Sequence, residues 1–588
     1  MVNHFLVCSS FEETWINDSP ILFLGEWCRK YDRRHIWQNL DAEVIPYHWD
    51  NNKKFNADYL YLESIYENLL IELSESLNRI HGENRSLRYW RILIGPWLAY
   101  FCQILFDRWT MIRLANENYK ILGARIIKRN KKIDVANDME DAIKLFISDD
   151  WNEAICGELL KFSDIPIEEV DKLHSNFIIP GQKYYDGKLA KFIKIILRQL
   201  NYLLSFFSKK NEFFFMSTYL PVKREIALQL MLGQLPKLWQ SEKSPKIPVD
   251  YFRRGSEFFF AKEGDVTFPT ILRMLVKHHL PTLYFEGYSD LISFTNSVPW
   301  PKSPKVIFTS NSYLSDDVFK SYAAQKVEGG ALLVLGQHGG NCGGVLLRNF
   351  GEDHQLKISD KYLSWGWTLR GRENVVPIGN FKTISKALIK DFRKSVLLVE
   401  FANTRMSLHM CSMIVGVQWL QYFDQQCRFV QSLSKEIQSH LQIRLFSEDR
   451  GWFQKERWLD RFTGIAIDDG LQSIDSLIKR AKIVICTYSG TTYLDTLVCN
   501  VPTVMFWAPK HWEQGPSCQV YFDQLKSAGI YHETPESAAN HLTKIWNNID
   551  AWWQDPIVQK AREDFCEFYS KPMEKPITNL RNFFTEIA

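Results

Sequence analysis

The chain has 588 residues, enough for two or three ordinary domains that each bury a large core. Apolar residues make up 46% and charged residues 24%, a globular profile that excludes an intrinsically disordered chain. Lysine and arginine number 71 against 68 aspartate and glutamate, and this balance argues against a protein that binds nucleic acid through its overall charge. Any anion must therefore be bound by a local site.

The cysteines and the apolar runs bear on the compartment. The 11 cysteines are scattered from Cys8 to Cys566, with no CxxC pair and no cluster at zinc-ligand spacing, so we expect a reducing cytoplasm and no structural metal. The most apolar stretch, 92–106, is too short to span a bilayer. We expect it to form a buried helix rather than a helix on a membrane surface. Membrane contact is then at most peripheral, at the inner face of the membrane.

The first part of the chain is expected to be rich in helices. A strand at 21–24 precedes long helical patterns at 59–80 and 89–115. From about residue 212, short apolar runs alternate with helical stretches, as is typical of a parallel sheet with crossover helices. Strands are expected there at 213–216, 282–285, 306–308 and 331–335.

The last third repeats this alternation and predicts one doubly wound domain. Helices are expected at 415–433 and 471–480. The expected strands lie at 396–400, 443–446, 464–467, 483–487 and 503–507.

The expected fold is therefore α/β, with two Rossmann-like domains that face each other across a cleft. The stretch 376–394, which carries Pro377 and Gly379, is the expected junction. We expect an acceptor-side domain with helical insertions at 1–385 and a nucleotide-donor domain at 386–540. The helices at 541–588 could cross back to the first domain.

A run of small residues follows the expected strand 483–487. Ser489, Gly490, Thr491 and Thr492 open the next helix. Their N–H groups and hydroxyls would lie at a helix N-terminus, where the macrodipole favours a phosphate. A plain helix cap is the alternative, but the position at the carboxyl end of a strand favours binding of a donor phosphate.

A glycine-rich run with one histidine follows the expected strand 331–335. His338 is followed by Gly339, Gly340 and Asn341. The glycines would let the backbone approach a ligand, while the imidazole suits a general base or, when protonated, a partner for a leaving phosphate. The alternative is a glycine-rich turn with an incidental histidine. We expect His338 to be catalytic and the three residues after it to contact the donor.

Four charged residues are weaker candidates. Arg405 and Arg444 could contact the donor, although salt bridges explain such charges equally well. Asp468 could offer a carboxylate to a sugar hydroxyl, or it could cap a helix. Glu26 is a candidate for the acceptor side. No spacing indicates a cation site, and we expect the reaction to need neither a metal nor a cofactor.

Several runs carry a family resemblance: FLGEWC, SLRYWRILIGPWL, QHGGN with ISDKYLSWGW, and TYSGTTYLDTL with NVPTVMFW. With these runs the sequence resembles, over nearly its whole length, a transferase family found in bacterial O-antigen and surface-polysaccharide gene clusters. More distantly, it is similar to wall teichoic acid glycerophosphotransferases and to capsule Kdo or sialic-acid transferases. Those are enzymes of the two-Rossmann-domain (GT-B) kind with cytidine nucleotide donors.

The resemblance implies roles for individual residues. His338 matches the catalytic or phosphate-contacting histidine, and Ser489, Gly490 and Thr491 match the donor-phosphate loop. The His-Pro pair that binds the cytidine nucleotide in several relatives is absent, and the stretch from Arg444 to Arg450 lies approximately in its place.

The expected function is that of a glycosyltransferase in surface-polysaccharide synthesis, such as that of O-antigen. Its expected partners are a nucleotide-activated sugar, with a CMP-ulosonate favoured, and a glycan or lipid-linked acceptor, but no nucleic acid. One alternative is transfer of a polyol phosphate from a CDP-polyol. Another is binding of a nucleotide or sugar without catalysis, as a component of the assembly machinery.

Overall fold

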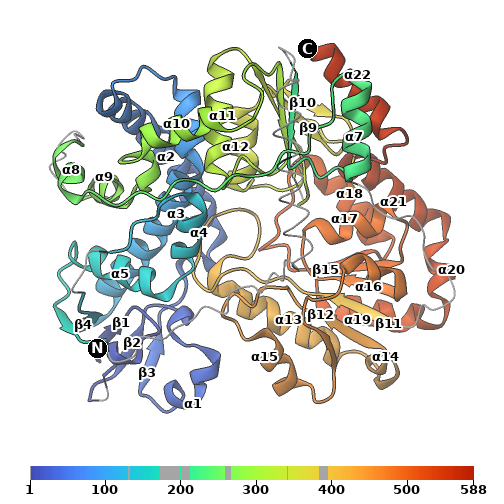
Figure 1. Cartoon of the computed structure of the whole chain (residues 1–588). Coiled ribbons are helices and arrows are strands. Elements are labelled where there is room, and N and C mark those ends of the chain that lie inside the picture. Colours follow the sequence, from blue (N-terminus) through green and yellow to red (C-terminus); the bar gives the residue numbers. More distant parts are fainter. Residues whose placement is uncertain are drawn as a thin grey trace.

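The computed structural model describes residues 2–16, 18–129, 133–172, 199, 212–258, 266–340, 342–382 and 395–588. In these ranges the strands form three sheets, and every pairing between named strands is parallel (Figure 1). Helices connect most consecutive strands within each sheet, with β9 and β10 as an exception. The expected α/β class with a helix-rich first half is confirmed.

The first sheet belongs to the N-terminal part and has the order β3-β2-β1-β4-β5. Of its strands, the sequence pattern predicted only β2. The pattern missed the short strands β3 and β5 because they contain no apolar run. Their sequences are AEV and IEEV, and none of their residues is fully buried. The strands are β1 (Asn3–Val7), β2 (Ile21–Phe23), β3 (Ala42–Val44), β4 (Lys120–Ile127) and β5 (Ile167–Val170).

Two long helices follow the first three strands. Helix α2 (Asn52–His81) begins at the cap Asn51 and ends at Gly82, which adopts the left-handed conformation with φ +65°. Helix α3 (Leu87–Asn118) packs against α2, α11 and α12, and most of its side chains between residues 92 and 106 are buried. The expectation of a buried helix is confirmed. Among the described residues, no helix combines the length and the apolar character needed to cross a bilayer.

The second sheet has its strands in simple sequential order, β10-β9-β8-β7-β6. The strands expected at 213–216, 306–308 and 331–335 are confirmed to within one residue at each end. The observed strands are β6 (Phe213–Met216), β7 (Val306–Thr309), β8 (Leu332–Gly336), β9 (Lys361–Ser364) and β10 (Val375–Pro377).

The strand expected at 282–285 is wrong. This stretch forms the buried 3-10 helix η5 (Thr282–Tyr284). The N–H groups of Thr282 and Leu283 donate to the carbonyls of Ala136 and Asn137, each over 2.9 Å, instead of to a neighbouring strand. An apolar run alone does not distinguish a buried turn from a buried strand.

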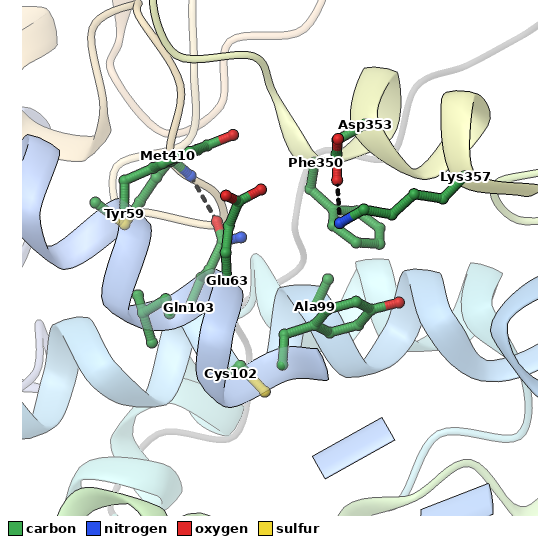
Figure 2. Close-up of a pocket in the computed structure, with 11 residues that line it drawn as sticks. Tyr59, Glu63, Ala99, Cys102, Gln103, Phe350, Asp353, Lys357 and Met410 are labelled. Carbon is green, nitrogen blue, oxygen red and sulfur yellow. Dashed lines mark hydrogen bonds and ion pairs between the residues drawn. The ribbon is translucent and has the colours of Figure 1, made fainter. Parts of the chain in front are cut away.

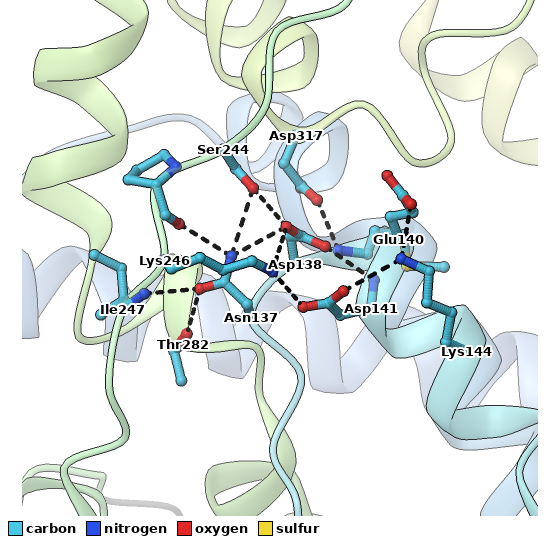
Figure 3. Close-up of polar contacts among 12 residues, drawn as sticks. Asn137, Asp138, Glu140, Asp141, Lys144, Ser244, Lys246, Ile247, Thr282 and Asp317 are labelled. Carbon is cyan, nitrogen blue, oxygen red and sulfur yellow. Dashed lines mark hydrogen bonds and ion pairs between the residues drawn. The ribbon is translucent and has the colours of Figure 1, made fainter. Parts of the chain in front are cut away.

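A polar network around Asn137 and Asp138 joins three parts of the chain (Figure 3). Asn137 accepts the N–H of Ile247 over 2.9 Å, and Asp138 caps α4 (Met139–Phe146). Asp317, at the start of α11 (Asp317–Glu328), accepts the N–H of Met139 over 2.7 Å. The bond from Ile247 attaches the segment 244–247 to this network, and the bonds from Thr282 and Leu283 to residues 136 and 137 attach the helix η5 to it.

The third sheet has the order β13-β12-β11-β14-β15-β16, so the strand order reverses between β11 and β14. In doubly wound sheets, ligands bind at the carboxyl ends of the two strands that flank such a reversal. All five strands expected in this part are present, displaced by one or two residues. They are β11 (Ser395–Val399), β12 (Leu441–Arg444), β13 (Ala466–Asp468), β14 (Ala481–Cys486) and β15 (Thr503–Phe506), followed by β16 (Tyr531–His532).

The helices around the third sheet start later than the pattern predicted. The helix expected at 415–433 begins with the 3-10 turn η7 (Gly416–Gln418) and continues as α13 (Trp419–Gln431). The helix expected at 471–480 is α16 (Ile474–Arg480), and α17 (Thr491–Val498) follows β14.

The last helix returns to the second sheet. On α22 (Pro576–Ile587), the ring of Phe584 lies 5.3 Å from the rings of Phe215 and Phe308 and 6.0 Å from that of Phe213. Figure 1 shows α22 beside α7. The remaining α-helices are α1 (Arg34–Trp37), α5 (Asp149–Leu160), α7 (Val222–Met231), α8 (Tyr251–Ser256), α9 (Phe268–His279), α10 (Tyr288–Ser297), α12 (Phe350–Ile358), α14 (Lys435–Ser439), α15 (Gln454–Arg461), α18 (Pro516–Ser527), α19 (Pro535–Ile545), α20 (Ile549–Trp553) and α21 (Pro556–Tyr569).

The network predicts a large stability effect at Asp317. Its buried carboxylate is 2.8 Å from the buried ammonium of Lys320 and accepts the hydroxyl of Tyr284 over 2.6 Å. The substitution Asp317→Asn leaves that ammonium without a counter-ion, and we expect it to lower the free energy of unfolding by about 3 kcal/mol. As a control, Glu140→Ala breaks an exposed ion pair with Lys144 and should cost about 0.5 kcal/mol or less. Urea unfolding measures both, and equal effects would contradict the prediction.

Candidate active site

The carboxyl ends of the second and third sheets meet at one place. The N–H of Gly340, in the loop after β8, donates to the hydroxyl of Thr491, the first residue of α17, over 2.8 Å. A Cβ atom on Gly339 would lie 2.6 Å from the same hydroxyl oxygen. The two loops that the sequence singled out, at 338 and 489, are therefore in direct contact.

The loop that carries His338 is held by buried side chains. Gln337 Oε1 accepts both the backbone N–H of Trp365 and the indole N–H of Trp367, each over 2.9 Å. Gly343 has φ +74°, which favours glycine, and its N–H donates to Glu352 Oε1 over 3.0 Å. Burial raises the pKa of Glu352 to about 7. The loop is thus fixed before any ligand binds.

His338 itself is half-buried in this loop. Burial lowers the pKa of its imidazole below the ordinary value of 6.5, a hydrogen bond to the backbone of Ser310 opposes this shift, and the charge of Lys382 adds to it. The ring centroid lies 5.6 Å from that of Tyr219, and the ring planes are inclined by 31°. A neutral imidazole at pH 7 is able to accept a proton.

The first turn of α17 supplies the other half of the site. Its N-cap is Gly490, so no capping side chain accepts its N–H groups, and the positive end of the helix dipole points to this loop. A Cβ atom on Gly490 would lie 2.3 Å from the ring of Tyr488. The Tyr488 hydroxyl in turn lies 3.0 Å from that of Thr492, and Ser489 is buried. The first N–H groups of α17 are thus not capped by the side chain of its N-cap residue, and their binding of a phosphate stays a prediction.

Sequence reasoning missed a cation at this place. The ammonium of Lys382 lies 2.6 Å from Asp495 on α17, and its charge acts on His338. Lys382 lies shortly after β10, the edge strand of the second sheet, in the stretch 376–394 that the sequence identified only as a junction. No local pattern in the sequence around Lys382 indicated that its side chain would reach α17.

Arg444 and Asp468 lie together at the edge of the third sheet. Their side chains form an ion pair, and Asp468 Oδ1 also accepts the N–H of Gly470 over 3.1 Å. Burial raises the pKa of Tyr488 to about 12, and the guanidinium of Arg444 opposes this shift. Both candidates therefore lie on the side of the 489 loop, already paired with each other.

Arg405 and Glu26 lie elsewhere. The buried Arg405 donates to the carbonyl oxygen of Trp27 and to Asp149, and it thereby ties the loop after β11 to the N-terminal part. Glu26 pairs with Arg29. No interaction among the described residues connects either side chain to the 338 or 489 loop, and Asn341 lies outside the described residues. Their roles at the donor or the acceptor stay predictions.

Two cavities lie away from these loops. The one between α2, α3 and α12 has a volume of about 20 Å³, room for about one water molecule (Figure 2). Its wall includes the ion pair of Asp353 with Lys357, which measures 2.5 Å. The other, of about 460 Å³, is lined by residues of 498–500 and 562–572. Neither is lined by His338 or by the start of α17.

Comparisons with known proteins give one match in sequence. Residues 4–584 match the model of a family described as LIC12162 family transferase. A comparison with curated proteins found no match.

Several solved structures are similar at low identity. A variant of the wall teichoic acid polymerase TagF soaked with CDPG is 12% identical, with a TM-score of 0.31, and the match covers 68% of this chain and 98% of TagF. MurG of Acinetobacter baumannii is 10% identical, with a TM-score of 0.32 and coverage of 64% and 100%. WaaG, a glycosyltransferase involved in lipopolysaccharide biosynthesis, is 10% identical, with a TM-score of 0.28 and coverage of 63% and 99%.

The contact between the loops predicts that Gly339 tolerates no side chain. In Gly339→Ala the new methyl would meet Thr491 Oγ1 and displace the His338 loop, and we expect turnover to fall about a hundredfold in a protein that still unfolds cooperatively at a somewhat lower melting temperature. Gly255→Ala is the control, because nothing lies within 4 Å of its Cβ position. Steady-state rates and thermal unfolding measure the two effects. Normal turnover in Gly339→Ala would show that the loop contact does not matter for activity.

Proposed function

Because the chain belongs to the LIC12162 family of transferases, we propose that it transfers a sugar from a nucleotide-activated donor to a glycan or lipid-linked acceptor. The observation that carries the proposal is the hydrogen bond from Gly340 to Thr491. It brings a histidine with a lowered pKa and the start of a helix to one place, and these groups come from two different sheets.

The proposed reaction assigns one task to each group. His338 takes the proton of an acceptor hydroxyl, whose oxygen then bonds to the anomeric carbon of the donor sugar. The bond between that carbon and the phosphate oxygen breaks, and its electron pair leaves with the nucleotide. The N-terminus of α17 and the ammonium of Lys382 stabilise the negative charge of the leaving phosphate.

For the donor we propose a CMP-ulosonate, used to build a bacterial surface polysaccharide such as O-antigen. The family resemblance of the sequence supports this choice. The site also offers one helix start and one nearby lysine, a small set of positive groups that suits a leaving group with a single phosphate. On this proposal the reaction takes place in the cytoplasm, at the inner face of the membrane if the acceptor is lipid-linked.

The test is product analysis with CMP-, CDP-, UDP- and GDP-activated donors. We expect release of CMP and a product heavier by one ulosonate residue. A product heavier by a polyol phosphate would instead favour transfer from a CDP-polyol, and release of a nucleoside diphosphate would indicate an ordinary sugar nucleotide. Donor binding without turnover would contradict an enzymatic role and favour a binding component.

Within that assay, His338→Ala should lower kcat about a hundredfold or more, as expected for loss of a general base. The exposed His35 offers a matched control, and His35→Ala should retain full activity. Wild-type rates in His338→Ala would remove this histidine from the mechanism.

The pH dependence follows from the direction of the His338 shift. A base works in its neutral form, and burial favours that form by lowering the pKa of His338, so the acid limb of kcat/KM should lie below pH 6.5. Lys382→Gln removes a positive charge that favours the neutral imidazole, so the acid limb should move to higher pH. A limb at or above 6.5 in the wild type, or a limb that Lys382→Gln leaves in place, would contradict the assignment.

A further inference from the structure

The loop after β6 has a strained backbone. Ser217 has φ +49° and Tyr219 has φ +61°, although neither is a glycine. Residues with a side chain rarely adopt a positive φ, and for a bulky aromatic residue this backbone conformation is a clear outlier. Such strain persists only where the surroundings enforce it, and it is concentrated at functional sites.

Hydrogen bonds to the end of β7 enforce this conformation. The N–H of Ser310 donates to the carbonyl of Ser217 over 3.0 Å, and its hydroxyl donates to the carbonyl of Thr218 over 3.2 Å. The hydroxyl of Ser312 donates to that of Ser217 over 3.0 Å. The hydroxyl of Thr218 in turn donates to the carboxyl group of Glu225 over 2.6 Å. The two bonds from Ser310 hold the backbone carbonyls of Ser217 and Thr218 against the end of β7.

The aromatic ring of Tyr219 therefore stays exposed to solvent beside His338. Thr218 and Leu220 are 2% and 8% exposed, whereas Tyr219 between them is 45% exposed. Its ring centroid is 5.6 Å from that of His338. The burial of a tyrosine ring would stabilise the fold, so a strained backbone that keeps the ring outside gives no benefit to the core.

We propose that Tyr219 binds the acceptor, with its ring stacked on the sugar whose hydroxyl His338 deprotonates. This inference rests on the proposed function. Tyr219 and His338 lie in loops that follow β6 and β8 of the second sheet, whereas the proposed phosphate site lies at the start of α17, after β14 of the third sheet; we therefore place the ring on the acceptor side. The C–H groups on one face of a sugar ring are apolar and pack well on an aromatic face, and a tyrosine loses little conformational entropy in doing so.

The proposal can be tested without turnover by measuring the binding of simple sugars with saturation-transfer NMR. The probes are the methyl glycosides of glucose, galactose, N-acetylglucosamine and rhamnose. We expect at least one glycoside to bind, with a Kd that rises about tenfold in Tyr219→Ala and stays near the wild-type value in Tyr219→Phe. Tyr61→Ala is the matched control, since Tyr61 is 41% exposed on α2, and its Kd should be unchanged. Equal Kd values in all variants, or no glycoside bound by the wild type, would overturn the proposal.

The substitution Tyr219→Gly separates binding from structure. Glycine adopts φ +61° without strain, so the melting temperature should stay constant or rise while glycoside binding is lost. A fall in melting temperature with binding retained would assign Tyr219 a structural role and contradict the proposal. Glycoside binding that depends on Tyr219, in a protein that turns over none of the donors, would leave this inference standing and overturn only the proposed function.

Discussion

The hydrogen bond between the N–H of Gly340 and the hydroxyl of Thr491 joins two loops that lie about 150 residues apart in sequence. Each loop follows a buried strand of a different parallel sheet, and each is built from small residues that let backbones approach closely. A bulkier residue at 339 or 490 would collide with its neighbours. Gly339 thus lets the two loops approach each other, whereas Gly490 leaves room for the ring of Tyr488 within its own loop.

The surroundings keep these loops in place before a ligand arrives. Gln337 fixes the start of the His338 loop through two tryptophans, and Glu352 holds the N–H of Gly343. Groups that are already oriented need not reorganise when charge develops in the transition state, which is the main way that a protein stabilises such charge. Lys382 interacts electrostatically with both loops, because it pairs with Asp495 on α17 and its charge adds to the lowering of the His338 pKa that burial causes.

The sequence predicted those elements whose burial is reflected in a local run of apolar residues. The strands before His338 and Ser489 contain the apolar runs 332–335 and 483–486, which are followed by glycine and hydroxyl residues, and both strands were found within one or two residues of their expected bounds. Strands β3 and β5 were missed because edge strands with polar residues lack that pattern. The run 282–285 was predicted to be a strand because it is a short run of mostly apolar residues, but its hydrogen bonds go to a distant loop.

Other features of the site depend on tertiary contacts that no local pattern encodes. Lys382 gains its place from an ion pair with a residue 113 positions later. The positive φ of Tyr219 follows from hydrogen bonds to β7, and a Ser-Thr-Tyr run predicts no such strain. The side chain of Arg405 donates to Asp149 and to the carbonyl of Trp27, contacts that join the loop after β11 to the N-terminal part and that no local pattern predicts.

The most direct measurement of the central claim is a crystal structure of the protein with bound CMP. The account predicts that the phosphate of CMP accepts hydrogen bonds from the first N–H groups of α17, with the His338 ring facing the same phosphate from the other loop. A nucleotide bound to another edge, such as the carboxyl ends of the first sheet, with the start of α17 unoccupied, would contradict it.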